Sequence, residues 1–340
     1  MRNLISAVLM LPLCAQAADR VEAGFSVHGS SEPVSISDMV SGWDGAFTPG
    51  RYAYADARMG AALTLDDWTV RIERRWYYYF TFSRGMSVFY RNQEQGLDSA
   101  SDYDLSLDAL GFYAEGGVLS HPLSFADVTV TPSVGLYRVY DYQFGELDGV
   151  SAAGSDVSAS ATLDYHFSED KILDYPVDVP AGTGFTAGVE VAFTGLRDWQ
   201  MSLTLSDLLN RWQLPDAGFT TGCINLGSSA GEVCSSSGAA SGRSGTGDYS
   251  TRIPVTVDAQ VVYTPYAVRA QVYQHGLYRR LSVQKDWQTG VGALGVSLHS
   301  THQLGLHWQG QFGRLSLLSD DQRLHYARDL QLDAALSWSW

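Results

Sequence analysis

The chain ends in the stretch DLQLDAALSWSW, residues 329–340. Leucine, alanine and tryptophan occupy every second position from Leu330 to Trp340, and the positions between carry aspartate, glutamine, alanine and serine. Successive side chains of a β-strand point to opposite faces of its sheet. The stretch therefore predicts a strand with one apolar face, one polar face and an aromatic residue at its end.

The same alternation recurs along most of the chain. It is clear at 157–167, 185–194, 253–264 and 304–309, where apolar residues again occupy every second position. A period of two residues indicates strands rather than helices, which repeat every 3.6 residues. The sequence therefore predicts an all-β protein, either a soluble sandwich or a membrane barrel.

The beginning of the chain favours the barrel. An apolar run, Leu4–Leu13, is followed by Ala15–Ala17, a small-x-small cleavage site, so residues 1–17 are predicted to be a signal peptide. Cys14 leaves a lipoprotein signal as an alternative. The apolar run is shorter than the roughly 20 residues of a spanning helix. Because only helices and closed barrels satisfy the backbone in lipid, residues 18–340 are predicted to form a transmembrane antiparallel β-barrel.

The composition agrees with a membrane barrel and argues against a nucleic-acid-binding protein. Charged residues make up 17% of the chain, below the ~25% of ordinary domains, while Tyr and Trp number 19 and 9. The net charge of −15 argues against nucleic-acid binding. We find no dinucleotide or phosphate-binding motif and expect no cofactor and no metal.

Short turns and long segments set the expected sidedness. Three short turns, 66–68, 197–199 and 285–287, carry charge and are followed by Trp at the start of the next strand. Barrel turns are short on the periplasmic side, so we place these turns there. The long segments should then face outward; they are 29–50, 168–182, 210–250 and 320–328.

The segment at about 210–250 is predicted to be a long extracellular loop. Its Gly/Ser/Ala tract favours a mobile loop. Cys223 and Cys234 lie within it, and two cysteines in one loop of an exported protein predict a disulfide.

This sidedness gives about sixteen strands, with fourteen as the alternative count. The predicted strands are 20–28, 52–65, 67–82, 85–93, 104–118, 124–144, 154–167, 183–195, 198–208, 252–264, 266–275, 277–286, 289–299, 302–310, 312–318 and 329–340.

The chain resembles Gram-negative outer-membrane β-barrel proteins. Their last strand carries a polar residue, then Gly, then two aromatics at alternate positions; here Asp333, Trp338 and Trp340 match, and Ala335 stands where Gly is usual. The resemblance implies an outer-membrane location, with lipid and the barrel-assembly machinery as partners. It also implies that both termini face the periplasm.

Charged residues around the 66–67 turn are the first candidates to line the lumen. By parity, Asp56, Arg58, Arg71, Glu73 and Arg75 face inward. A charged ladder of this kind sets ion preference in a pore. A structural ion-pair network is the alternative. On the same register Arg74 faces lipid, at a cost of roughly 2–4 kcal/mol.

A second wall combines amides with charge. Asp258 and Gln260 face inward on one predicted strand, and Arg269 and Gln271 on the next. These residues either help to select a solute or form a wet lumen face without selection.

The pattern predicts a passive, porin-like channel for small solutes, with no enzyme activity. The alternative is a barrel with a plugged lumen that acts in assembly, adhesion or export. An outer-membrane hydrolase is the third hypothesis; it would need a Ser or Asp beside His275, His299 or His307.

Overall fold

The computed structural model describes residues 19–154, 158–170, 175–227, 233 and 240–340. The predicted signal peptide, residues 1–17, lies outside the described residues.

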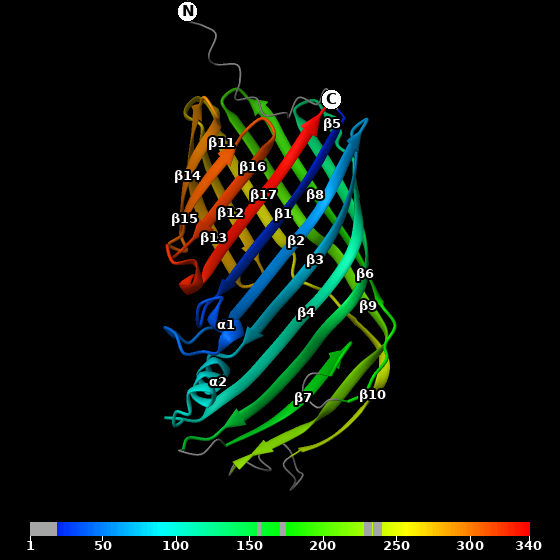
Figure 1. Ribbon diagram of the computed structural model, residues 1–340, viewed down its shortest axis with the longest axis vertical. Helices are drawn as coiled ribbons and strands as arrows, with labels where there is room; N and C mark the ends of the chain where they lie inside the picture. Colours follow the sequence, from blue (N-terminus) through cyan, green and yellow to red (C-terminus); the bar gives the residue numbers. More distant parts are fainter. Residues whose placement is uncertain (1–18, 155–157, 171–174, 228–232, 234–239) are drawn as a thin grey trace, which may run out of the picture.

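Fourteen antiparallel strands form a closed barrel wall (Figure 1). The ring closes where the last strand pairs with the first, from Arg20 opposite Ser339 to Ser30 opposite Asp329. In order around the ring, the strands are β1 (Arg20–Ser31), β2 (Tyr52–Leu65), β3 (Trp68–Phe82), β4 (Tyr103–Ser120), β6 (Val128–Ser151), β8 (Gly182–Leu196), β9 (Trp199–Leu226), β11 (Thr256–Tyr263), β12 (Val268–His275), β13 (Tyr278–Thr289), β14 (Gly292–His299), β15 (Leu304–Gln309), β16 (Gly313–Ser319) and β17 (Asp329–Ser339).

Three further strands lie outside the ring. β5 (Leu123–Phe125) extends the turn between β4 and β6. β7 (Ala159–Phe167) pairs with β6 and with the far part of β9, and β10 (Ala240–Thr251) pairs with β9. β7, β10 and the long ends of β4, β6 and β9 project from one end of the barrel, whereas β5 lies at the opposite end (Figure 1).

The wall has the alternative count of fourteen strands rather than sixteen, because two predicted strands are not part of it. The strand predicted at 154–167 is β7. Residues 85–93, predicted as a strand, form helix α2 (Arg84–Gln95). The Ser83 hydroxyl accepts a hydrogen bond from the Met86 amide at 2.9 Å, and Gly96 ends the helix with φ of 60°. Such caps favour a helix over a strand.

Two other local predictions need correction. The segment 210–250 is mostly strand, because β9 continues to Leu226 and β10 begins at Ala240. Cys223 lies on β9, but Cys234 is outside the described residues, so the disulfide stays a prediction. The turn predicted at 285–287 is wrong: β13 continues to Thr289, and the chain turns at residues 290–291.

The outer face of the wall is apolar. Side chains such as Val21, Ile72, Leu136, Leu203, Leu281 and Leu306 are exposed there. Trp68, Trp199, Trp287 and Trp338 are exposed at the end of the barrel where the turns are short. An apolar band flanked by aromatic residues is typical of barrels that cross a bilayer.

Arg74 faces outward, as its parity predicts. Its side chain is 54% exposed, and its Nε lies 2.9 Å from Glu115 Oε1 on the neighbouring strand β4. The pair reduces the cost of exposing the guanidinium to lipid. Among the residues that the structure describes, no helix is both long and apolar enough to span a bilayer.

Both ends of the described chain lie at the same end of the barrel (Figure 1). The turn between β2 and β3, at Asp66 and Asp67, is also there; both residues have positive φ, as a tight hairpin requires. Barrels of this kind carry short turns on the periplasmic side, so we call this the periplasmic end. The connection that holds helix α1 (Asp38–Ser41) and the one that holds α2 lie at the other end.

Candidate functional site

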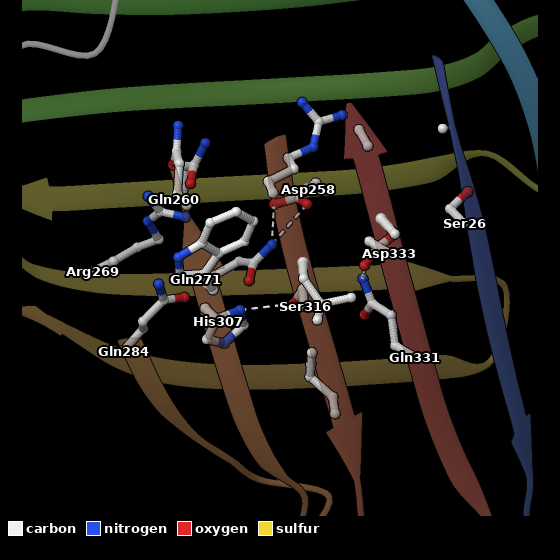
Figure 2. Close-up of a pocket in the computed structure, with 18 of the residues that line it drawn as sticks. Ser26, Asp258, Gln260, Arg269, Gln271, Gln284, His307, Ser316, Gln331 and Asp333 are labelled. Carbon is white, nitrogen blue, oxygen red and sulfur yellow. Dashed lines mark hydrogen bonds between the residues drawn. The ribbon is translucent and has the colours of Figure 1, made fainter. Parts of the chain in front are cut away.

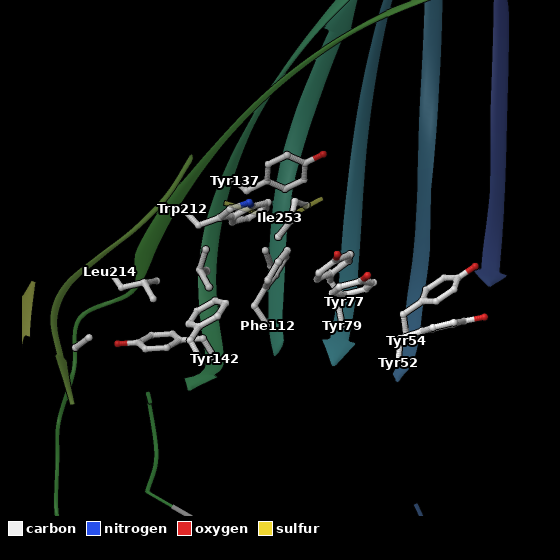
Figure 3. Close-up of a cluster of buried hydrophobic side chains, with 14 of the residues drawn as sticks. Tyr52, Tyr54, Tyr77, Tyr79, Phe112, Tyr137, Tyr142, Trp212, Leu214 and Ile253 are labelled. Atoms are coloured by element: carbon white, nitrogen blue, oxygen red, sulfur yellow. The ribbon is translucent and has the colours of Figure 1, made fainter. Parts of the chain in front are cut away.

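Large aromatic side chains gather inside the barrel toward the extracellular ends of its strands (Figure 3). They come from strands on both sides of the ring, and Tyr77 and Trp212 have no solvent-exposed surface. We call this set the aromatic layer; it comprises Tyr52, Tyr54, Tyr77, Tyr79, Phe112, Tyr137, Tyr142, Phe144, Trp212 and Tyr278.

Contacts across the lumen hold the aromatic layer together. Phe112 on β4 lies against Trp212 on β9, with 4.1 Å between the ring centroids. The Tyr77 hydroxyl on β3 is 3.0 Å from Nε2 of His275 on β12, and the Tyr79 hydroxyl accepts a hydrogen bond from the Leu277 amide at 2.8 Å. These strands are not neighbours in the ring, so the layer closes the lumen at this level.

An ion cluster lies directly on the periplasmic side of the aromatic layer. It contains Asp56, Arg58, Arg75 and Asp207. Arg75 has no exposed surface and donates to Asp56 Oδ2 at 2.9 Å and to both Asp207 oxygens at 3.0 and 2.9 Å. Arg58 Nη2 donates to Asp56 Oδ2 at 2.8 Å. Two guanidinium groups thus balance two carboxylates, and Arg75 links β3 to β9 across the lumen.

A bulge in β9 positions Asp207 for this contact. The ladder between β8 and β9 shifts between Ala187 and Val189, so extra residues of β9 bow out of register. Asp207 has φ of 55° in this bulge, a strained value for a residue with a side chain. On the other side of β9, Asn210 bonds to the segment between β10 and β11: its amide donates to the Ile253 carbonyl and its oxygen accepts from the Ile253 amide, at 3.0 and 2.8 Å.

The periplasmic half of the lumen is hollow. A cavity of about 650 Å³ extends from residues near the rim, such as Glu22 and Gln288, to Arg58 below the aromatic layer. Amides, carboxylates and guanidinium groups project into it (Figure 2), and apolar residues complete its lining. Its volume is within the range of small-molecule sites.

All nine residues predicted to line a pore face the lumen. Asp56 and Arg75 belong to the ion cluster. The other seven line the cavity: Arg58, Arg71, Glu73, Asp258, Gln260, Arg269 and Gln271. The structure brings the two predicted walls to opposite sides of one cavity. Whether they contact a passing solute stays a prediction.

Sequence reasoning missed Asp207 and the extent of the aromatic layer. The alternation breaks at Asp207-Leu208-Leu209-Asn210, and this break was the available signal of a bulge. The partner of Asp207 is Arg75, far away in the sequence, and no local pattern indicates that pairing. Phe112 and Ala114 put apolar side chains into the lumen, which interrupts the expected polar inner face of β4.

His299 and His307, two histidines of the cavity, form hydrogen-bond chains with serine hydroxyls. Ser297 Oγ is 2.7 Å from Nε2 of both His299 and His307, and His307 Nδ1 is 2.7 Å from Ser316 Oγ. A hydrolytic triad needs a third group, commonly a carboxylate, that orients the imidazole. In the described part of the chain, neither His299 nor His307 has a hydrogen bond to a carboxylate, and Ser297 is buried.

A closed antiparallel barrel with an apolar outer band and a polar inner cavity defines a transmembrane β-barrel of the Gram-negative outer membrane. The three residues of the predicted assembly signal are on its last strand or directly after it. Asp333 faces the lumen, while Trp338 and Trp340 are exposed.

Solved outer-membrane proteins resemble this chain in fold. The ΔS2S3 mutant of TodX, a monoaromatic hydrocarbon channel of Pseudomonas putida, is 11% identical with a TM-score of 0.44; the match covers 96% of this chain and 91% of that one. The Ralstonia pickettii toluene transporter TbuX is 10% identical with a TM-score of 0.33, covering 96% and 90%. The Escherichia coli outer membrane protease OmpT is 9% identical with a TM-score of 0.22, covering 95% and 96%.

At these identities and TM-scores, a likeness says nothing about a shared activity. No protein-family model matches the chain, and no curated protein matches it.

Proposed function

We propose that this protein is an outer-membrane channel for small solutes and that the aromatic layer is its gate. The cavity carries the proposal. A barrel with a purely structural role does not need a polar hollow of about 650 Å³ that extends half-way through its lumen. The nine predicted pore-lining residues are the polar path in this proposal, and it assigns them no catalytic role.

The mechanism is diffusion of solute through the polar cavity, limited by opening of the aromatic layer. Opening requires that contacts such as Phe112–Trp212 and Tyr77–His275 separate. The ion cluster resists this movement, because Arg75 connects β3 to β9 and its partners would lose their buried counter-charge. Assembly of the barrel by the barrel-assembly machinery belongs to the same proposal.

One observation favours a second function, a plugged barrel that conducts nothing. Arg75, Tyr77 and Trp212 are fully buried at one level of the lumen. In that case the function would belong to the long sheet of β7, β9 and β10, which would serve as a surface for attachment or export.

Single-channel conductance in a planar bilayer separates the two functions. We expect wild-type protein to show brief, infrequent openings and Trp212→Ala to show stable conductance steps, because the substitution removes the largest ring of the layer. Trp287→Ala is the matched control: its ring is exposed on the outer face, so its conductance should equal that of the wild type.

One result of the same measurement would contradict the channel. If wild type and Trp212→Ala both fold, as shown by heat-modifiable migration on gels, and neither conducts, the lumen is plugged and the second function stands.

A further inference from the structure

Arg280 is a buried guanidinium group that faces the cavity and has no carboxylate within 4.0 Å among the described residues. It lies on β13, is 3% exposed and has its Cζ 5.2 Å from the centre of the Tyr273 ring. Its one hydrogen bond in the described part of the chain is a long one, from Nη1 to Gln303 Oε1 at 3.4 Å, and its buried Nε has no partner there.

Three of the other four arginines of the cavity have a carboxylate nearby, unlike Arg280. Arg58, Arg71 and Arg314 each lie within 4.0 Å of a carboxylate. The exception is Arg269, whose buried Nε also has no partner among the described residues. Because a buried charge is costly unless it is paired, two cations beside one cavity with no carboxylate within 4.0 Å in the described part of the chain point to an anionic group of a ligand.

Carboxylates without an arginine partner are present in the same cavity. Asp258 accepts hydrogen bonds from Gln271 Nε2 at 2.8 and 2.7 Å, and Asp333 accepts one from Gln331 Nε2 at 2.7 Å (Figure 2). Asp286 likewise accepts from Gln284 at 2.7 Å. A glutamine amide orients a carboxylate but leaves its charge in place.

The register keeps these opposite charges apart. Asp258 on β11 is opposite Tyr273 on β12, and Tyr273 is opposite Arg280 on β13. The tyrosine ring therefore stands between the carboxylate and the guanidinium group. Formal charges cancel over the whole cavity wall, where Arg58, Arg71, Arg269, Arg280 and Arg314 face Glu22, Glu73, Asp258, Asp286 and Asp333.

We propose that the cavity holds a binding site for a small zwitterion of the amino-acid type, with its carboxylate at Arg280 and its ammonium group at Asp258. Such a solute pairs with Arg280 and Asp258 at once. A simple anion would be repelled by the carboxylates of the cavity, and a simple cation would be repelled by its arginines. This inference deepens the proposed function and rests on it for the route by which the solute reaches the cavity.

Three probes of matched size test the site by isothermal titration calorimetry on the refolded barrel in an uncharged detergent. They are L-alanine, the anion N-acetyl-L-alanine and the cation L-alaninamide. We expect the zwitterion to bind at least about tenfold more tightly than either singly charged probe, because it alone makes both charge-assisted contacts.

Variants assign the two ends of the ligand. Arg280→Gln should weaken alanine about tenfold or more and leave alaninamide unchanged, and Asp258→Asn should weaken alanine and leave N-acetylalanine unchanged. Arg279→Gln is the matched control, since Arg279 neighbours Arg280 on β13 but points to the outer face and is exposed. Asp258→Asn keeps the side-chain shape, so it tests the site even if Arg280→Gln does not fold.

Three results would overturn the zwitterion site. They are no binding of alanine to the wild type, equal affinities for alanine and N-acetylalanine, or equal losses from Arg280→Gln and Arg279→Gln. The assay needs no conduction, so its failure beside a conducting Trp212→Ala leaves the channel standing. Alanine binding to a barrel that never conducts would support the site and contradict the channel.

Discussion

The two halves of the lumen differ although the same strands build both. On β3, Tyr77 and Tyr79 point into the aromatic layer, while Arg71 and Glu73, a few residues closer to the periplasm, line the cavity. Both halves obey the same alternation of inward and outward side chains. Alternation therefore determines which side chains enter the lumen, and their size and cross-lumen partners determine whether the lumen is filled or hollow.

The boundary between the halves is the ion cluster. Its carboxylates and guanidinium groups are buried like the rings above them but are polar like the cavity below. Substitutions should therefore lower the free energy of unfolding most in the ion cluster, less in the aromatic layer and least in the cavity.

The largest effect is expected at the boundary. Arg75→Gln removes the buried counter-charge that Asp56 and Asp207 share and leaves Arg58 alone beside two carboxylates, so the free energy of unfolding should fall by about 3–5 kcal/mol. Denaturant titration of the folded barrel in detergent measures this.

Arg71→Gln is the control for that loss. The Arg71 side chain is half exposed and 3.9 Å from Glu73, so its removal should cost less than about 1 kcal/mol. Equal losses for Arg75→Gln and Arg71→Gln would mean that the cluster does not differ energetically from the cavity wall.

A smaller effect is expected within the aromatic layer. Tyr77→Phe removes the hydroxyl that contacts His275 Nε2 at 3.0 Å and keeps the ring, so it should cost about 0.5–1.5 kcal/mol. Tyr78→Phe alters the exposed neighbour on the same strand and should change the unfolding free energy by less than about 0.5 kcal/mol. A larger loss from Tyr78→Phe would contradict the assignment of the two faces.

The smallest effect on stability is expected in the cavity, where the predicted change in conduction is one of ion selectivity. With five cationic and five anionic groups in its wall, an opened Trp212→Ala channel should show little preference between small cations and anions. Adding Asp258→Asn and Asp333→Asn leaves 5 − 2 = 3 anionic groups, so the reversal potential in a salt gradient should shift toward anion preference.

Asp320→Asn provides the comparison for that shift, because Asp320 lies in the connection between β16 and β17 and not in the cavity. A reversal potential that moves as far with Asp320→Asn as with the cavity pair would place the selecting charges outside the cavity.

The sequence predicted the barrel because the alternation that indicates each strand can be recognised within that strand alone. The bounds of β2 follow from alternation, and the inward faces of Arg58, Arg75 and Gln271 follow from parity. Helix α2 was missed because the signals in its caps, Ser83 and Gly96, were not weighed against a strand.

The closed layer could not be predicted in the same way. It depends on contacts between residues far apart in the chain, such as Tyr77 with His275 and Arg75 with Asp207. Alternation predicts that Arg75, Tyr77 and His275 face inward, and it is interrupted at Asp207. It does not predict which strand lies across the lumen from another. The bulge that lets Asp207 reach Arg75 also departs from regular strand geometry.

The most direct test of the difference between the two halves is the rate at which a charged, membrane-impermeant thiol reagent modifies two cysteine variants of the folded barrel. Gln260→Cys places a thiol in the cavity, and Ala114→Cys places one, with little change in volume, at a fully buried position opposite Arg75 and next to the aromatic layer. We predict that Gln260→Cys reacts rapidly and that Ala114→Cys reacts on the order of a hundredfold more slowly, because it must wait for the layer to open. Equal rates would contradict a lumen that is hollow on the periplasmic side and closed at the aromatic layer.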